Sequence, residues 1–157
     1  MIIFTTNINA YDDIPDHYYD RDVKYVMFYD KPITKKGKWE FIKLDCKYDH
    51  PVLNAYHTRC NSHLWFDEPN VWIDGCYTMT EEFVKNSKEF LEKNEITLMN
   101  HPDKRTFLRE IMKLYRCGFV PESRLIKFCE DLHDIGFNPE FMDHTINCCL
   151  WRNNTPK

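Results

Sequence analysis

Short runs of β-branched and aromatic residues alternate along this chain with stretches of helical hydrophobic period, and this alternation constrains the fold most. Apolar runs bounded by turn residues predict strands at 2–6, 23–29, 39–44, 71–73, 96–99 and 145–151. Helical signals predict helices over 50–65, after a capping box at Thr78 and Glu81, over 103–116, and from Pro121 onward. The alternation predicts an α/β sandwich with a mostly parallel central sheet flanked by helices.

Chain length limits the number of domains. The 157 residues suffice for one sizeable core and are too few for two comfortable domains. No internal repeat, low-complexity tract or linker interrupts the sequence. Residues 1–157 are therefore expected to form a single domain.

Charge and cysteine content indicate the partners and the compartment. The formal net charge is −4 without a long basic stripe, which argues against nucleic acid as a main partner. No apolar run approaches the ~20 residues of a membrane span. The seven cysteines form no CxxC pair, and the first residues lack signal-peptide features. We expect free, mostly buried thiols in a cytoplasmic protein.

Asp74 is the leading candidate for a functional residue. It follows the short apolar run at 71–73 and precedes Gly75, where backbone can approach a ligand closely. In open α/β sheets, ligands bind at the carboxyl ends of strands. A carboxylate there could bind Mg²⁺ or Mn²⁺, with substrate phosphates completing the shell. The alternative is an ordinary β-turn, which Asp-Gly favours.

Further acids follow the first two predicted strands. Asp12 and Asp13 come after the first strand and Asp30 after the second, so all three could line the same edge of the sheet. Their alternative role is as solvated loop acids or caps of helices and turns.

Basic side chains and histidines form a second group of candidates. Arg105, Arg109 and Arg152 could neutralise a diphosphate through bidentate contacts, or lie on a solvated face. His63 and His101 lie near the ends of predicted elements, where a lone histidine is more often structural than catalytic.

Several short motifs occur in an order that points to one family. They are Phe4-Thr5-Thr6 with Tyr11-Asp12-Asp13, Phe28-Tyr29-Asp30, Ala55 with Arg59 and His63, Trp72-Ile73-Asp74-Gly75, His101-Pro102 with Arg105 and Glu110, and Leu150 to Asn154. This order resembles a GT-A-type glycosyltransferase family that includes plant proteins linked to seed mucilage and turgor control, and bacterial and viral members. The resemblance runs over nearly the whole chain.

The resemblance implies a GT-A-like, Rossmann-like fold that transfers a sugar from a nucleotide sugar to an unknown acceptor. Asp74 would hold a divalent cation, Mn²⁺ or Mg²⁺, against the donor diphosphate. The other implied site residues are Thr5, Thr6, Asn7 and Asp30 at the nucleoside, Arg105 or Arg152 at the phosphates, and Arg59, His63 and His101 without an assigned role. A viral member of the family would act in the host cytoplasm.

Two departures from the family pattern favour a different function. Cys76 stands where a second oxygen or basic side chain is usual, and the sequence ends before an Arg-Asp-Gln segment into which the family continues. The alternative is a non-catalytic nucleotide-binding or protein-interaction module on the same fold. A C-terminally short donor half would need a homodimer or a partner chain to complete its site. A metal-dependent phosphoesterase would show more clustered His and Asp ligands.

Overall fold

The computed structural model describes residues 1–100, 107–118, 121–136 and 145–153. These residues form two compact units. The first comprises Met1–Leu98 together with Asn147–Lys157, and the second comprises Met99–Ile146. Each unit is described by itself.

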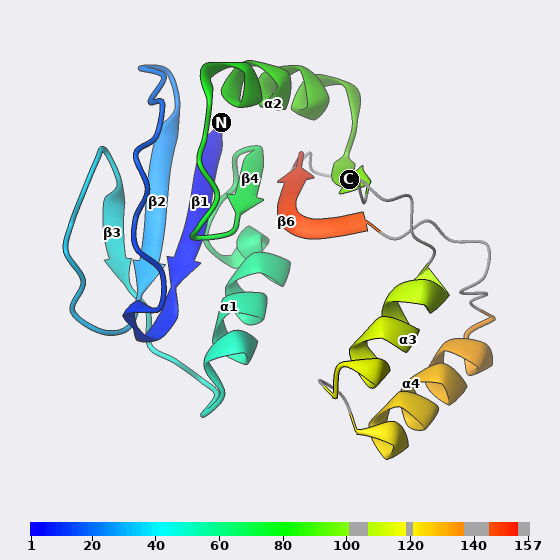
Figure 1. The fold of residues 1–157 in the computed structure, drawn as a ribbon. Helices are drawn as coiled ribbons and strands as arrows, with labels where there is room; N and C mark the ends of the chain where they lie inside the picture. The colour runs from blue at the N-terminus through cyan, green and yellow to red at the C-terminus, as the bar shows by residue number, and fades with distance from the viewer. Residues whose placement is uncertain (101–106, 119–120, 137–144, 154–157) are drawn as a thin grey trace. The chain divides into compact units, whose positions relative to one another are not determined.

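A six-stranded sheet organises the structure. Its strands are β1 (Ile2–Asn7), β2 (Lys24–Tyr29), β3 (Glu40–Lys43), β4 (Asn70–Ile73), β5 (Ile96–Asn100) and β6 (Thr145–Arg152). They lie in the order β3-β2-β1-β4-β6-β5, and β1, β2 and β3 run side by side in Figure 1. The α/β class is thereby confirmed.

The expectation of a mostly parallel sheet is wrong, because the sheet is mixed. Strands β3, β2, β1 and β4 pair in parallel, whereas β6 pairs with β4 in the antiparallel direction. This direction places Arg152 opposite Asn70, at the start of β4. The apolar pattern of β6 is compatible with either strand direction, so the sequence alone did not predict its orientation.

Strand β1 lies at the centre of the parallel part of the sheet. All six of its residues are buried, as expected for a strand covered on both faces. Phe4 lies beside Val26 on β2 and beside Trp72 on β4. These side chains belong to one core cluster with Phe28 and Phe66.

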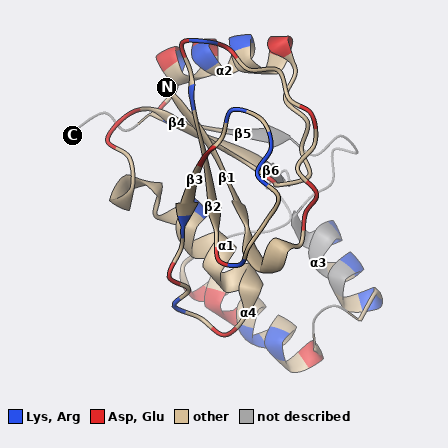
Figure 2. Ribbon diagram, turned by 90° about the vertical axis from the view of Figure 1, so that its left-hand side faces the viewer, with Lys and Arg blue, Asp and Glu red and all other residues tan. Residues whose placement is uncertain are grey.

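Two helices cover opposite faces of the sheet. Helix α1 (Pro51–Cys60) packs on β1, and its Ala55 contacts the cluster that contains Trp72. Helix α2 (Glu81–Lys93) lies on the other face, where Ser87 accepts a hydrogen bond from the buried indole of Trp151 at 2.7 Å. Trp151 pairs with Val71, the neighbour of Trp72, and successive strand residues point to opposite faces. The outer side of α2 carries charges of both signs (Figure 2).

The start of α2 differs from the prediction. Thr80, and not Thr78, is the N-cap, because its hydroxyl accepts a hydrogen bond from the backbone of Phe83. The chain before the helix is held away from helical geometry. There the Met79 amide donates to His17 Nδ1, and the Met79 carbonyl accepts from the Tyr18 amide.

The second unit contains two helices, α3 (Phe107–Arg116) and α4 (Glu122–Asp134), which contact each other. Both agree with the predicted helices, although residues 103–106 lie outside the described part of the chain. Among the described residues, no helix combines the length and apolarity needed to cross a membrane.

The cysteines are more exposed than expected. Among the six cysteines whose side chains are described, five free thiols are exposed: those of Cys46, Cys60, Cys76, Cys117 and Cys129. Cys149 is buried on β6. The expectation of mostly buried thiols is therefore wrong, because most of these cysteines fall in loops, at helix ends or on an outer helix face.

Candidate functional site

A pocket opens where the order of the parallel strands reverses. From β1 the chain continues outward to β2 and β3, whereas β4 lies on the other side of β1. In open α/β sheets, ligands bind at such a reversal of strand order, beside the carboxyl ends of the strands. The pocket there has a volume of about 230 Å³. Its lining comprises Thr6, Ile8, Tyr11 and Asp12 after or on β1, Pro51, Val52, Ala55 and Tyr56 on α1, and Trp72, Asp74 and Gly75 at β4.

Side-chain hydrogen bonds fix the turn that follows β1. The buried Asn7 amide group donates to the Asp12 carbonyl at 2.8 Å and accepts from the Asp12 amide at 3.2 Å. Asp30, at the end of β2, accepts from the Asn9 amide at 2.7 Å. Asn9 and Ala10 both adopt positive φ, 62° and 52°. The turn thereby holds the Asp12 side chain at the pocket.

Replacing Ala10 by Gly is expected to stabilise the protein by about 1 kcal/mol, because a side chain in the left-handed region strains the backbone. Chemical denaturation measures the change. The matched control is Ala55→Gly in helix α1, which should destabilise by about 1 kcal/mol. A loss of stability in Ala10→Gly would show that position 10 carries no such strain.

Because Gly75 has no side chain, the Asp12 side chain can lie close to the backbone that follows β4. A Cβ placed on Gly75 would lie 3.0 Å from Asp12 Cγ and nearer still to one carboxylate oxygen. The Asp12 side chain therefore packs over the backbone immediately after Asp74. This close approach brings the two carboxylates of the pocket together.

The pKa values of both carboxyl groups, Asp12 and Asp74, are raised in the folded chain. Burial is the main cause that raises the pKa of Asp74, and Asp12 raises it further, while Arg59 acts in the opposite direction. Burial also raises the pKa of Asp12, with a smaller contribution from Asp13. Burial thus opposes ionisation of both carboxyl groups, and a bound cation would offset this cost.

Arg59 lies beside the pocket, held by two rings. Its guanidinium carbon is 4.7 Å from the ring centroid of Tyr56 and 4.9 Å from that of Trp72. Such cation–π contacts fix the position of a positive charge. That charge lowers the pKa of Asp74, so it favours the ionised carboxylate.

Asp74→Asn is expected to raise the free energy of unfolding at pH 7 by about 0.5 kcal/mol, a small effect because solvent screens the half-exposed carboxyl. A carboxyl whose pKa is higher in the folded chain destabilises the fold above both pKa values, and the penalty disappears as pH falls through the raised pKa. The stability difference between variant and wild type should therefore shrink as pH approaches the ordinary value of 3.8. Denaturation at several pH values tests this, and a difference that grows in acid would contradict it.

Of the residues expected at the site, the structure brings together Thr6, Asp12 and Asp74, with Arg59 beside them. Asp13 is exposed and contributes through its charge. Asp30 and Asn7 shape the turn and do not line the pocket.

Three other expected residues lie elsewhere. Thr5 is buried and does not line the pocket, since it alternates with Thr6 along β1. Arg152 donates to Ser62 Oγ at 2.7 Å and to the Cys60 carbonyl at 3.1 Å, near the end of α1. His63 is exposed in the short 3₁₀ helix Ser62–Leu64. His101 and Arg105 lie outside the described residues.

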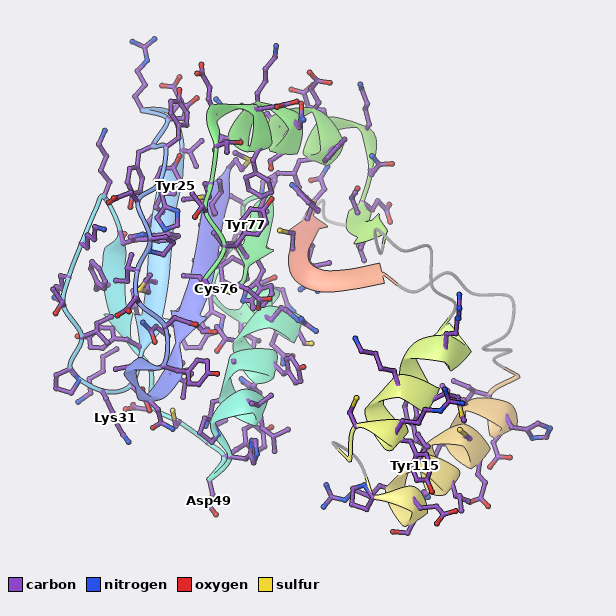
Figure 3. All side chains as sticks on the ribbon, in the orientation of Figure 1. Tyr25, Lys31, Asp49, Cys76, Tyr77 and Tyr115 are labelled. Atoms are coloured by element: carbon purple, nitrogen blue, oxygen red, sulfur yellow. The ribbon has the colours of Figure 1, made fainter. Side chains whose placement is uncertain are left out.

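The pocket also contains aromatic residues that were not among the expected site residues. Tyr11 is 87% exposed beside the carboxylates, and Tyr56 reaches the pocket from α1. Aromatic residues fill cores as often as they line sites, so their type alone gave no signal. Cys76 is exposed in the loop after β4 and does not line the pocket (Figure 3).

The pocket offers two carboxylates to a cation. Among the described residues, no three His, Cys, Asp or Glu side chains are grouped so that they could hold a metal ion by themselves. Two oxygen ligands fit a divalent cation that keeps waters or ligand phosphates in its shell, as Mg²⁺ commonly does. A cation here would therefore bind most strongly together with an anionic ligand.

Comparisons of the chain with protein-family models, curated proteins and solved structures gave no match.

Proposed function

We propose that this chain is a GT-A-like glycosyltransferase domain that binds a nucleotide sugar in the pocket between β1 and β4. The observation that carries the proposal is the placement of Asp12 and Asp74 in one pocket, at the carboxyl ends of parallel strands where the strand order reverses. The order of sequence motifs, with Trp72-Ile73-Asp74 as its best match, supports the same assignment.

The charges of the pocket require a cation for such a ligand. A diphosphate would meet two carboxylates, whose Coulomb repulsion is strong in a partly buried site. Asp12 and Asp74 would hold a Mn²⁺ or Mg²⁺ between them and the diphosphate. When bound, the ion supplies Lewis-acid stabilisation of the charge on the leaving diphosphate.

The remaining lining residues suit the nucleoside. Tyr11 and Tyr56 provide rings against which a base can stack, and stacking contributes about 1–3 kcal/mol per base. Thr6 supplies a hydroxyl at the strand end. Arg59 partly offsets the burial that raises the pKa of Asp74, and so favours the ionised carboxylate that a cation would bind.

A second candidate is nucleotide binding without turnover. The two carboxylates of the pocket would both be engaged by the cation, and the other ionisable lining residues are Tyr11 and Tyr56. No carboxylate or histidine among the described lining residues is then left to act as a general base. This observation favours a binding module, or a site completed by a second copy or a partner chain.

Single-turnover assays with sugar nucleotides, Mn²⁺ and a mixed panel of acceptors separate the two candidates. Transfer or hydrolysis of the donor that depends on Asp74 supports the glycosyltransferase. Saturable binding without turnover supports the binding module. If no nucleotide sugar binds with Mn²⁺ or Mg²⁺, both candidates are wrong.

A further inference from the structure

A second pocket lies beside helix α1 and shares no lining residue with the first. It has a volume of about 370 Å³ and lies at the carboxyl end of β3. Helix α1 contributes Asn54 and His57 to this pocket, whereas it contributes other residues to the first. Its size is within the range of small-molecule sites, which begins at about 300 Å³.

Trp65 provides an exposed ring in this pocket. Trp65 is 41% exposed, and its ring packs against that of the fully buried Phe28, with ring centroids 4.9 Å apart. The core therefore holds the ring in place while part of it remains open to solvent. A ring fixed in this way can bind an apolar surface of a ligand at little cost in side-chain entropy.

The charged residues of the pocket are mostly basic. Lys43 and Lys47 contribute two positive charges. Asp45 contributes one carboxylate. This set can bind an anionic group through the lysines and accept hydrogen bonds from hydroxyl groups through Asp45.

The backbone around the pocket is held by Asn54. Its side-chain oxygen accepts from the amides of Lys47 and Tyr48, both at 3.0 Å. Its amide nitrogen donates to the Tyr48 carbonyl at 2.7 Å. The Tyr48 ring in turn contacts His57, with centroids 5.8 Å apart. The loop that carries Lys47 is thus ordered before any ligand arrives.

We propose that this second pocket binds a hexose that carries an anionic group, either a phosphate or a carboxylate. The pyranose ring lies on Trp65, its hydroxyl groups donate to Asp45, and the anionic group binds Lys43 and Lys47. A neutral sugar leaves the two lysines unused, and a free phosphate leaves the Trp65 ring unused. The inference does not depend on the function proposed for the first pocket.

Titration of the full chain with glucose 6-phosphate, followed by tryptophan fluorescence, tests the proposal. Trp65 is the natural reporter, because the other three tryptophans are at most 6% exposed. We expect saturable binding of glucose 6-phosphate. Glucose and inorganic phosphate should each bind about tenfold more weakly or not at all. Glucuronate in a parallel titration distinguishes a carboxylate from a phosphate as the preferred anion.

Variants test whether glucose 6-phosphate binds in this pocket. Lys43→Ala/Lys47→Ala removes exposed side chains and should weaken binding of glucose 6-phosphate about tenfold or more. The matched control Lys85→Ala/Lys93→Ala, on exposed positions of α2, and Asp74→Ala at the first pocket should leave it unchanged. Equal losses in the control, tighter binding of adenosine monophosphate, or no saturation by glucose 6-phosphate or glucuronate would overturn the proposal.

Discussion

Asp74→Ala is expected to lower the affinity for a nucleoside diphosphate with Mn²⁺ at least about 100-fold, a loss of about 2.7 kcal/mol. Asp74 and Asp12 are the carboxylates of the pocket, so the variant leaves one carboxylate for the cation and its diphosphate. A ligand present at about 100 times its Kd stabilises the wild type by about 2.7 kcal/mol. The variant should lose this ligand-induced stabilisation in thermal unfolding.

The control for this prediction is Asp13→Ala. It removes the same charge from a neighbouring exposed position that does not line the pocket. Its ligand-induced stabilisation should stay close to that of the wild type. If Asp74→Ala responds to the ligand as the wild type does, Asp74 is not part of the site.

Asn54→Ala is expected to cost about 3 kcal/mol of stability, the largest effect that we predict for the fold. The buried Asn54 side chain makes three hydrogen bonds of 2.7–3.0 Å and a longer one of 3.4 Å to the His50 carbonyl. Alanine leaves these backbone groups without that partner, at about 1 kcal/mol for each good bond. For a chain of this size, the melting temperature should fall by about 6–12 °C.

Asn61→Ala provides the comparison for Asn54→Ala. The Asn61 side chain makes a single hydrogen bond, to the His57 carbonyl at the end of the same helix. Its loss should cost about 1 kcal/mol or less. Similar losses in the two variants would show that the Asn54 network does not organise the loop before α1.

The positions of the strands could be predicted because each one is an apolar run between turn residues. The strand predicted at residues 2–6 is found as Ile2–Asn7, and that predicted at 145–151 as Thr145–Arg152. Strand direction could not be predicted in this way, since pairing with β4 is a long-range contact. The antiparallel direction of β6 has a consequence for Arg152. Arg152 lies opposite Asn70 at the start of β4, whereas Asp74 follows the other end of that strand.

The carboxylates of the site could be predicted because position along a parallel strand determines which edge a residue reaches. Asp12 and Asp74 follow β1 and β4, which pair in parallel. The roles of Asn7 and Asp30 could not be predicted, because a polar side chain at a strand end can bind either a ligand or a nearby turn. In the structure both bind the turn at residues 9–12.

The start of helix α2 could not be predicted from the local sequence alone. Thr78 with Glu81 forms a capping-box pattern, yet Thr80 caps the helix. Contacts of Met79 with Tyr18 and His17, about 60 residues earlier in the chain, decide between them. Such contacts cannot be read from a short stretch of sequence.

Paramagnetic broadening by Mn²⁺ tests the central proposal most directly. In an amide-resolved NMR spectrum of the wild type, uridine or guanosine diphosphate with a small amount of Mn²⁺ should broaden signals near the metal. We predict the strongest broadening at Tyr11–Asp13 and Asp74–Cys76, the two segments that meet at the pocket. Broadening that is uniform along the chain, or strongest elsewhere, would contradict a cation-dependent nucleotide site between β1 and β4.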